Sequence, residues 1–336
     1  MGRDLALDLG TANTLVYRQD DGIVFDEPTV VALHAGTNRV VGMGDEVWRM
    51  IGADSGNVVA VRPLRQGTMT EFDITQRMLE VVLRRVGVMK FPKPRVLVCV
   101  PSMASEVEKR AIEEAIRHSG GSRNVTLVEE PLAAAIGAGL PIHEPIGNLV
   151  VDIGGGRSEM AVVSMGGVVS GRSVSLGGFD LDAAIQEHIR ERYGVAIGEK
   201  AAEEIKIAIG SAFPTPLGKA AVVTGRELVS GNTLEITVTE DEIRAAMSGA
   251  VRGIVEAART CLAEAPPELT HDILETGMFL TGGGSLLRGI DMLLAQECEV
   301  PVHATERPLE TVVIGAGRML EHLADYQTSF QLVRRL

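Results

Sequence analysis

Apolar runs that close on an acid and a glycine mark the start of the chain. Residues 5–10 form such a run, which ends on Asp8 and Gly10, and strand-like segments follow closely at residues 16–17 and 23–25. A short continuous apolar run bounded by turn residues is typical of a strand buried on both faces. The pattern therefore predicts a buried strand at the N-terminus, followed by further strands in a meander.

The same pattern returns near the middle of the chain. Residues 148–156 form an apolar strand that closes on Asp152 and three glycines, and residues 160–165 and 168–170 resemble hairpin partners. Two similar strand-to-turn elements predict an internal duplication, in which each half of the molecule opens on one of them. A third strand, at residues 278–281, also ends in glycines.

Helical periodicity appears between these strands. Apolar positions at helical spacing predict a helix over residues 106–118, which Ser102 can cap, and another over residues 199–209. Thr239, with Glu242 three residues later, forms a capping-box pattern at the start of a further helix. Strands alternating with helices, without a low-complexity linker, predict a layered α/β protein whose halves pack together.

Composition removes several classes of protein. Of the 336 residues 45% are hydrophobic, which allows a large core, and only 3% are aromatic, so that core must be mainly aliphatic. The net charge of −13 argues against binding nucleic acid through a basic face. The three cysteines are far apart, so neither a disulfide framework nor a zinc site is indicated. We expect no signal peptide and no membrane-spanning helix, and a reducing cytosol as the setting.

The glycine-bearing turns carry the candidate chemistry. Glycine lets backbone N–H groups approach an anion closely, and an aspartate at a strand end can hold Mg²⁺ through water. Each turn alone is more often a tight connection, but three of them, two with a strand-end aspartate, predict a phosphate clamp with a metal. The sequence has neither a P-loop motif nor a GxGxxG after the first strand, so P-loop and dinucleotide-binding sites are excluded.

The motifs resemble those of the MreB family, the rod-shape-determining bacterial members of the superfamily of actin, sugar kinases and DnaK-type chaperones. The resemblance spans almost the whole chain and rests on residues 8–17, 22–32, 59–64, 98–102, 129–137, 151–156, 198–206 and 280–289. It implies an α/β, actin-like ATPase fold with two RNase H-like domains, each with a smaller inserted subdomain, and a nucleotide cleft between them. The implied first domain covers residues 1–32, 62–143 and 316–336, with a small subdomain at 33–61. The second covers 144–180 and 244–315, with a small subdomain at 181–243.

The resemblance also assigns roles to residues. Asp8 and Asp152 match the metal-directing acids, and Glu130 and Asp152 match the catalytic positions, with Glu130 orienting the attacking water. The alternative for Glu130 is a helix N-terminal charge stabilised by the helix dipole. The implied cofactors are ATP and Mg²⁺. The positions that match nucleotide-binding residues are Thr11, Ala12, Asn13, Gly154, Gly155, Gly156, Arg157, Glu203, Glu204, Ile205, Lys206, Gly282, Gly283, Gly284 and Ser285.

One position departs from the family pattern. After the second glycine turn the family usually has Thr-Thr-Glu, whereas this chain has Arg157-Ser158-Glu159. A threonine hydroxyl can hold water beside the outer phosphate, whereas an arginine can only donate hydrogen bonds. Arg157 could pair with a phosphate oxygen, pair with Glu159 or Glu130, or point into solvent. We expect ATP binding to be kept and hydrolysis to be impaired.

The resemblance implies partners and a location as well. It predicts head-to-tail filaments of the chain itself, contact with the inner face of the cytoplasmic membrane, partnership with membrane proteins of cell-wall elongation, and no nucleic acid. Val88, Met89 and Phe91 match a membrane-contacting loop, for which the alternative is a buried turn. We therefore expect the protein to lie in the cytoplasm and to associate peripherally with the membrane. The alternative function is a soluble small-molecule kinase of the same superfamily, although we find no motif for its substrate pocket.

Overall fold

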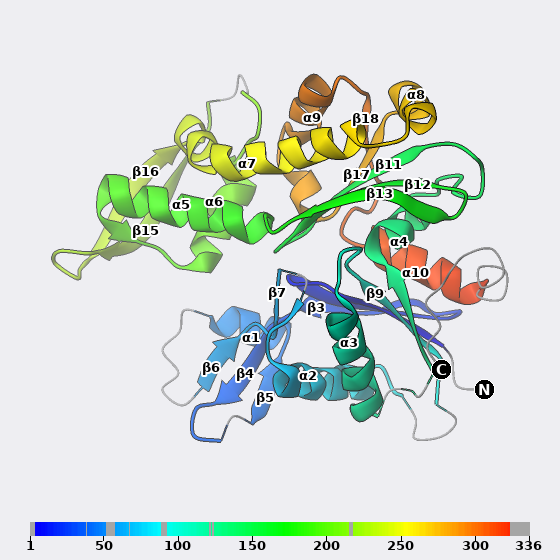
Figure 1. Cartoon of the computed structure of the whole chain (residues 1–336). Helices are drawn as coiled ribbons and strands as arrows, with labels where there is room; N and C mark the ends of the chain where they lie inside the picture. Colours follow the sequence, from blue (N-terminus) through cyan, green and yellow to red (C-terminus); the bar gives the residue numbers. More distant parts are fainter. Residues whose placement is uncertain are drawn as a thin grey trace.

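Two five-stranded sheets form the centre of the molecule (Figure 1). The computed structural model describes residues 4–37, 39–51, 58–66, 68–88, 93–120, 122, 124–214 and 218–322. The first sheet has the order β10-β9-β1-β2-β3. Its strands are β1 (Leu5–Leu9), β2 (Asn13–Arg18), β3 (Gly22–Pro28), β9 (Val96–Val100) and β10 (Val125–Glu129).

The second sheet repeats the topology of the first. Its order is β13-β12-β11-β17-β18, from β11 (Asn148–Ile153), β12 (Ser158–Ser164), β13 (Gly167–Val174), β17 (Met278–Thr281) and β18 (Val302–Ala304). In both sheets the acid-bearing strand, β1 or β11, pairs antiparallel with the next strand and parallel with a later one. The predicted internal duplication is therefore confirmed, and we call β1 to β10 with their helices the first half and β11 to β18 the second.

Two helices lie between the sheets. They are α4 (Glu130–Gly137), whose first turn holds Pro131, and α10 (Thr311–Glu321), and they pack against each other (Figure 1). Alanines on both helices join apolar side chains of the two sheets in one buried cluster, which includes Ala134, Ala316, Leu97 and Val150. Small side chains let the helices approach closely, so this layer joins the two halves.

The remaining elements cover the outer faces of the sheets and form two small subdomains. On the first half a small sheet, β5-β4-β6, lies with α1, and the short pair β7–β8 follows it. On the second half a small sheet, β14-β15-β16, lies beside the helices (Figure 1). The first-half elements are β4 (Val31–His34), β5 (Val40–Met43), α1 (Asp45–Met50), β6 (Val58–Val61), β7 (Leu64–Arg65), β8 (Thr68–Met69), α2 (Phe72–Arg85) and α3 (Glu106–His118). Those of the second half are α5 (Gly178–Tyr193), β14 (Val195–Ala196), α6 (Glu199–Ile209), β15 (Ala220–Glu227), β16 (Thr233–Thr239), α7 (Glu240–Ala263), α8 (Pro267–Thr276), the 3₁₀ helix η1 (Gly283–Leu286) and α9 (Ile290–Cys298).

Helix starts show where the sequence was informative and where it was not. Thr239 and Glu242 form the predicted capping box at the start of α7. The prediction that Ser102 caps α3 is wrong: the cap is Ser105, which forms its own capping box with Glu108. Ser102 is held elsewhere, because its N–H and hydroxyl both donate to the Glu159 carboxylate of the second half.

The predicted domain limits fall inside continuous helices in three places. The limits after residues 180, 243 and 315 lie within α5, α7 and α10. Each of these helices runs on without a break, so the limits that the family resemblance implied do not coincide with helix ends, and the division into domains stays a prediction.

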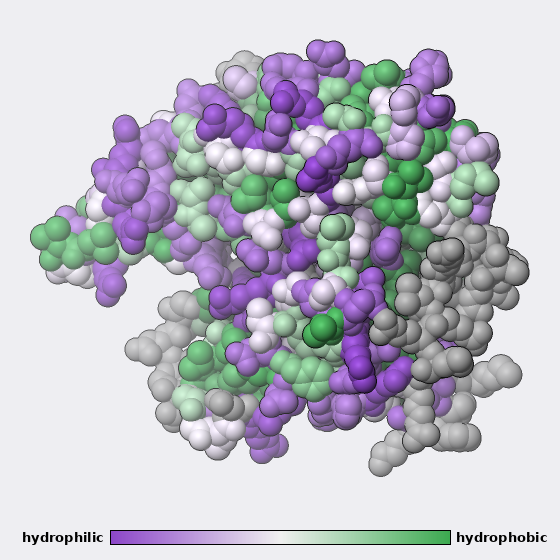
Figure 2. Space-filling model, in the orientation of Figure 1, coloured by the Kyte–Doolittle hydropathy of each residue, from purple (hydrophilic) through white to green (hydrophobic). Residues whose placement is uncertain are grey.

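None of the helices in the described part of the chain combines the length and apolar character that a bilayer-spanning segment needs. The surface is mixed rather than uniformly apolar, and it is hollowed between the arm that carries β15 and β16 and the lobe below it (Figure 2). The three cysteines are free and buried.

Candidate functional site

A cavity of about 470 Å³ lies between the two halves. The turns after β1, β11 and β17 all border it, together with the helices α5 and α6 and the segment before α10. Most of the residues selected from the sequence line it: Asp8, Thr11, Ala12, Asn13, Glu130, Asp152, Gly154, Gly155, Gly156, Arg157, Glu203, Lys206, Gly282, Gly283 and Gly284.

The first turn is held in shape by Thr29, which follows β3. The Thr29 hydroxyl donates to the Gly10 carbonyl at 2.7 Å, and its N–H donates to the Ala12 carbonyl at 2.7 Å. The Asn13 amide donates to the Asp26 carboxylate at 3.1 Å. These bonds come from the neighbouring strand, so the turn is a rigid edge of the cavity.

The second turn lies directly against the first. A Cβ added to Gly155 would lie 2.7 Å from the Ala12 Cβ, so only glycine allows the two turns to approach this closely. Behind the turn, Gly178 N–H donates to the Gly154 carbonyl at 3.0 Å and Phe179 N–H donates to the Gly155 carbonyl at 2.8 Å. The start of α5 therefore fixes the second turn against the first half.

The third turn closes the cavity from the β17 side. Gly282 has a φ of 80°, and a Cβ there would lie 2.2 Å from the Asp152 Oδ1. Glycine is required for both reasons. Ser285 does not line the cavity; its hydroxyl donates to the Gly282 carbonyl at 2.6 Å and so shapes the turn from outside.

Acids gather at the end of the cavity where these turns meet. Burial raises the pKa of Asp8 to about 7, with Asp26 adding to the shift, and burial raises the pKa of Asp152 to about 7, with Asp8 next in effect. The pKa of Glu130 is raised well above its usual value by burial and by the Glu159 charge. Carboxylates that raise one another's pKa are short of positive charge, so this end of the cavity favours a cation.

The acids fit a magnesium ion of the kind that uses few protein ligands. Mg²⁺ usually keeps several waters and binds through one or two carboxylates plus phosphate oxygens. Within the described residues, no group of three or more His, Cys, Asp or Glu side chains is arranged as a metal site. Asp8 and Asp152, one from each half, are the carboxylates that would face a nucleotide-bound ion.

Arg157 makes a contact that its sequence position did not suggest. Its Nε donates to the Gln66 carbonyl in the first half at 2.8 Å, and its Nη1 lies 3.4 Å from the Ser173 Oγ and 3.9 Å from a Glu159 carboxylate oxygen. Of the three alternatives, pairing with Glu159 comes closest, but the shortest contact crosses to the other half. Arg157 therefore bridges the halves beside the cavity.

The opposite end of the cavity is apolar. Ile207, Leu286 and Leu309 line it and are unusually open for large aliphatic residues, with 72%, 61% and 56% of their surface exposed. Exposed apolar walls around a cavity of this size suit a flat, partly apolar group such as a purine base. The Lys206 ammonium group, by contrast, lies at the start of α5 beside the second turn, where it donates to the Gly178 carbonyl and to Asp182.

Helix geometry decides which residues of α6 reach the cavity. Glu203, Lys206 and Ile207 line it, at spacings of three and four residues that place them on one face, and Gly210 lines it directly after the end of the helix. Glu204 and Ile205 do not line it: Glu204 is exposed, and Ile205 is buried in the core of the second half. The helical period thus turns Glu203, Lys206 and Ile207 toward the cavity and Glu204 and Ile205 away from it.

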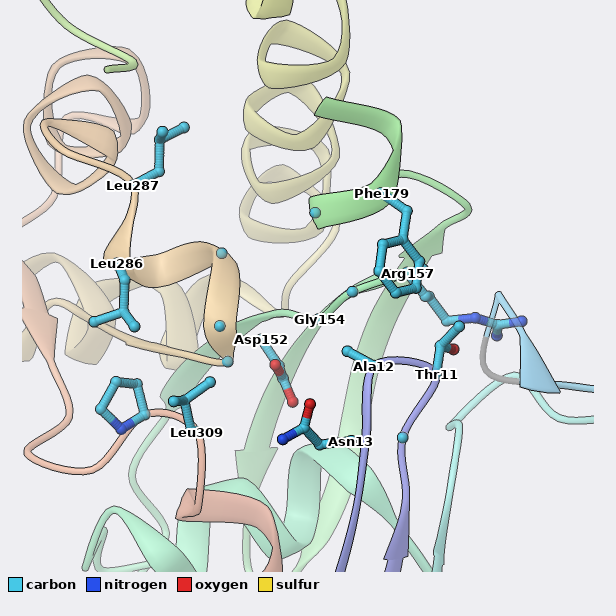
Figure 3. A pocket seen from close by; sticks show the side chains of 18 of the residues that line it. Thr11, Ala12, Asn13, Asp152, Gly154, Arg157, Phe179, Leu286, Leu287 and Leu309 are labelled. Atoms are coloured by element: carbon cyan, nitrogen blue, oxygen red, sulfur yellow. The ribbon is translucent and has the colours of Figure 1, made fainter. Parts of the chain in front are cut away.

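Figure 3 shows how the two ends differ. Asp152 and Asn13 point toward each other in the middle of the view, Thr11, Ala12, Arg157 and Phe179 lie on one side, and Leu286, Leu287 and Leu309 lie on the other. Sequence reasoning missed the apolar residues and Phe179. Only Ile207 had a signal, its helical spacing from Glu203; Leu309 and Phe179 reach the cavity through chain folding alone.

The predicted membrane loop lies only partly within the described residues. Met89 and Phe91 lie outside the described residues. Val88 is half-buried and packs against the core of the first half, and its N–H donates to the Leu83 carbonyl at 2.9 Å. The membrane role of these three residues stays a prediction.

Comparison with known proteins gives consistent matches over almost the whole chain. The family model described as MreB/Mbl protein matches residues 2–328. The Escherichia coli (strain K12) cell shape-determining protein MreB is 47% identical over 324 residues, covering 95% of this chain and 93% of that protein. The Bacillus cereus cell shape-determining protein Mbl is 45% identical over 322 residues, covering 96% of each chain.

The solved structures agree with the sequence relatives. The crystal structure of MreB5 of Spiroplasma citri bound to ADP superposes with a TM-score of 0.92 at 32% identity, covering 98% of this chain and 99% of that one. The same protein bound to AMPPNP gives a TM-score of 0.91.

Proposed function

Because this chain belongs to the MreB/Mbl family and has the actin-like fold of its solved relative, we propose that it binds ATP and assembles into filaments that determine cell shape. Nucleotide occupies the cavity between the halves, with its phosphates at the acidic end and its base at the apolar end. The observation that carries this proposal is the meeting of the Asp8 and Asp152 turns, one from each half, at a single cavity.

Each end of the cavity supports one part of the nucleotide. Backbone N–H groups of the glycine turns suit phosphate oxygens, and Asp8 and Asp152 suit a hydrated Mg²⁺ that such phosphates carry. Ile207, Leu286 and Leu309 suit the base. The relative MreB5 is bound to ADP in one structure and to AMPPNP in another, which supports a nucleotide in this place.

Slow hydrolysis follows from the catalytic residues. Glu130 begins α4 and lines the cavity beside Asp152, where a carboxylate can orient a water toward the outer phosphate. Both the catalytic role of Glu130 and its role as a helix N-terminal charge are compatible with this position. Arg157 occupies the place of a family threonine; its Nε donates to the Gln66 carbonyl, and its Nη1 lies 3.9 Å from a Glu159 carboxylate oxygen. Unlike a threonine hydroxyl, a guanidinium cannot accept a hydrogen bond from an attacking water. We expect tight binding and slow phosphate release.

Self-assembly uses surfaces away from the cavity. A contact between different faces of successive copies does not close on itself, so it produces a filament. The end of the arm formed by β15 and β16 exposes Leu228 and Val229, the latter with 95% of its surface open, and apolar colour gathers at this end of the arm (Figure 2). Such a protruding apolar end suits contact with another copy.

Membrane contact and cell-wall partners complete the proposal. The protein would lie in the cytoplasm at the inner face of the membrane, anchored by Val88, Met89 and Phe91, and would position membrane proteins of cell-wall elongation. Changing Met89 and Phe91 together to serine should reduce co-sedimentation with anionic liposomes while ATP affinity stays unchanged. Undiminished liposome binding would exclude this loop as the anchor.

A sedimentation assay tests the main proposal. Purified protein with Mg²⁺ and ATP should pellet at high speed and show filaments by electron microscopy, whereas protein without nucleotide should stay largely in the supernatant. A small-molecule kinase of the same fold would remain soluble under both conditions, and that result would contradict the proposal.

A further inference from the structure

Arg62, which follows β6 in the first half, reaches across to the second half. Its guanidinium carbon lies 4.3 Å from the centre of the Phe179 ring and 5.2 Å from the centre of the Trp48 ring. Its Nη2 also lies 3.5 Å from a Glu199 carboxylate oxygen. The side chain is only 15% exposed, so it is held between groups that belong to both halves.

Phe179 connects this arginine to the nucleotide cavity. The ring lines the cavity, and the Phe179 N–H donates to the Gly155 carbonyl of the second phosphate turn at 2.8 Å. Arg62 itself does not line the cavity. A side chain that holds the Phe179 ring in place, as Arg62 does, therefore also shapes one wall of the proposed nucleotide site.

Trp48 connects the same arginine to the small sheet of the first half. It lies in α1 and packs against the buried cluster of Val30, Ala32 and Val47. The three side chains Trp48, Arg62 and Phe179 thus form a continuous stack from the small sheet to the cavity wall, which we call the cross-cleft stack.

The stack is the stronger of the two contacts that Arg62 makes. An arginine plane between aromatic faces is stabilised most when water is excluded from it. The Glu199 side chain is 61% exposed, and an ion pair with such a group contributes little. Arg157, which joins the halves through Gln66, is a separate bridge, and we expect it to remain when Arg62 is changed.

We propose that Arg62 is a positioning residue that holds Phe179 against a bound nucleotide, so that the small sheet, through Trp48, sets how long the nucleotide stays. This inference rests on the proposed nucleotide site. The side chain acts through Phe179 and touches no part of the nucleotide. Loss of the stack should loosen one cavity wall and speed nucleotide release, with little change in the rate of association.

The test is the release of a fluorescent N-methylanthraniloyl-ATP, in the presence of Mg²⁺, after rapid mixing with excess ATP. Arg62→Ala should release it about fivefold faster than the wild type or more. Trp48→Leu should do the same from the far end of the stack, whereas Trp48→Phe, which keeps an aromatic face, should restore the wild-type rate. Arg49→Ala is the matched control, since Arg49 lies in the same small subdomain with its side chain 77% exposed.

Acceleration below about fivefold in either folded variant, Arg62→Ala or Trp48→Leu, would overturn the inference, as would a Trp48→Phe variant as fast as Trp48→Leu. Trp48 does not line the cavity. If Phe179 shaped the cavity wall without help from Trp48, the Trp48 variants would therefore release the nucleotide at the wild-type rate. A wild-type protein that does not bind the fluorescent ATP would instead contradict the proposed function, and this inference with it.

Discussion

The two ends of the cavity are built from different parts of the chain. The apolar end comes almost entirely from the second half and the segment that follows it, through Ile207, Leu286 and Leu309. The acidic end is shared, because Asp8 and the first turn come from one half and Asp152 and the second turn from the other. In the proposed binding mode the base is therefore held by one half alone, whereas the phosphates and their metal require both.

This difference indicates where nucleotide state can change the protein. A group that contacts only one half gains the same binding energy whether the halves are close together or apart. A phosphate or metal held between Asp8 and Asp152 gains binding energy only when the two turns meet, so it stabilises the arrangement in which they do. The acidic end is thus the part of the cavity that can couple ATP to assembly.

Among the changes that test the difference between the two ends, removing Asp152 should have the largest effect on nucleotide affinity. Asp152→Ala should weaken binding of Mg²⁺-ATP by at least about tenfold, which is the loss of one charge-assisted contact. Calorimetric titration measures this, and Asp291→Ala, an exposed acid of the same half, is the control. Binding of ADP in the presence of EDTA should change much less, and an equal loss for both ligands would contradict a metal role.

Changing the apolar end should weaken all nucleotides alike. Leu309→Asp removes an apolar wall from the base and should weaken both ATP and ADP by about fivefold, the loss expected for one aliphatic contact of roughly 1 kcal/mol. Leu274→Asp is the matched control, because Leu274 is 50% exposed, close to the 56% of Leu309, and lies in the second half outside the cavity. A loss for ATP alone would show that Leu309 senses the phosphates and would break the distinction between the two ends.

Restoring a hydroxyl beside the phosphates should have a smaller effect, on rate rather than on binding. Arg157→Thr should raise steady-state phosphate release about threefold, because it frees Glu159 from the arginine and returns a group that can hold water. Arg259→Thr, an exposed arginine of the same half, should leave the rate unchanged. A lower rate in Arg157→Thr would identify Arg157 as a cation that stabilises the transition state.

Of the four predictions, the one that concerns the pH dependence of stability has the smallest expected effect. Since the folded pKa values of Asp8 and Asp152 are raised from 3.8 to about 7, the unliganded protein holds protons that the unfolded chain has lost. Their contribution to stability is present below about pH 4 and is lost as pH rises through 7. Mg²⁺-ATP needs both acids ionised, so its thermal shift should be larger at pH 8 than at pH 6, by about 2 °C or more.

Differential scanning fluorimetry checks this pH effect. A double variant, Asp8→Ala with Asp152→Ala, should lose the difference between the two pH values. A thermal shift by Mg²⁺-ATP that is as large at pH 6 as at pH 8 in the wild type would show that the two acids do not titrate with the ligand.

The sequence predicted the acidic end much better than the apolar end. Each strand-end aspartate is followed within a few residues by its glycine turn, so local pattern alone predicted β1, β11 and the turns after them. The actin-like fold predicted from the family resemblance is confirmed by the structure of MreB5. Phe179 and Leu309 carry no local mark, because they reach the cavity only when α5 and the segment before α10 are packed in place.

Arg157 and Ser102 also show what local sequence pattern cannot predict, because both make contacts between the two halves. Both were assigned local roles, one toward phosphate or a nearby acid and the other as a helix cap. Their observed partners, Gln66 and Glu159, lie in the opposite half of the molecule. A single sequence specifies such contacts only through the complete fold.

The most direct test of the shared acidic end is calorimetric titration of an Asp8→Ala variant with Mg²⁺-ATP. Asp8 belongs to the first half, whereas the residues proposed to hold the base belong to the second, so this one change asks whether the first half takes part in binding. Asp45→Ala, an exposed acid of the first half, is the control. The account predicts an affinity at least about tenfold weaker than that of the wild type. An unchanged affinity in the folded variant would contradict it.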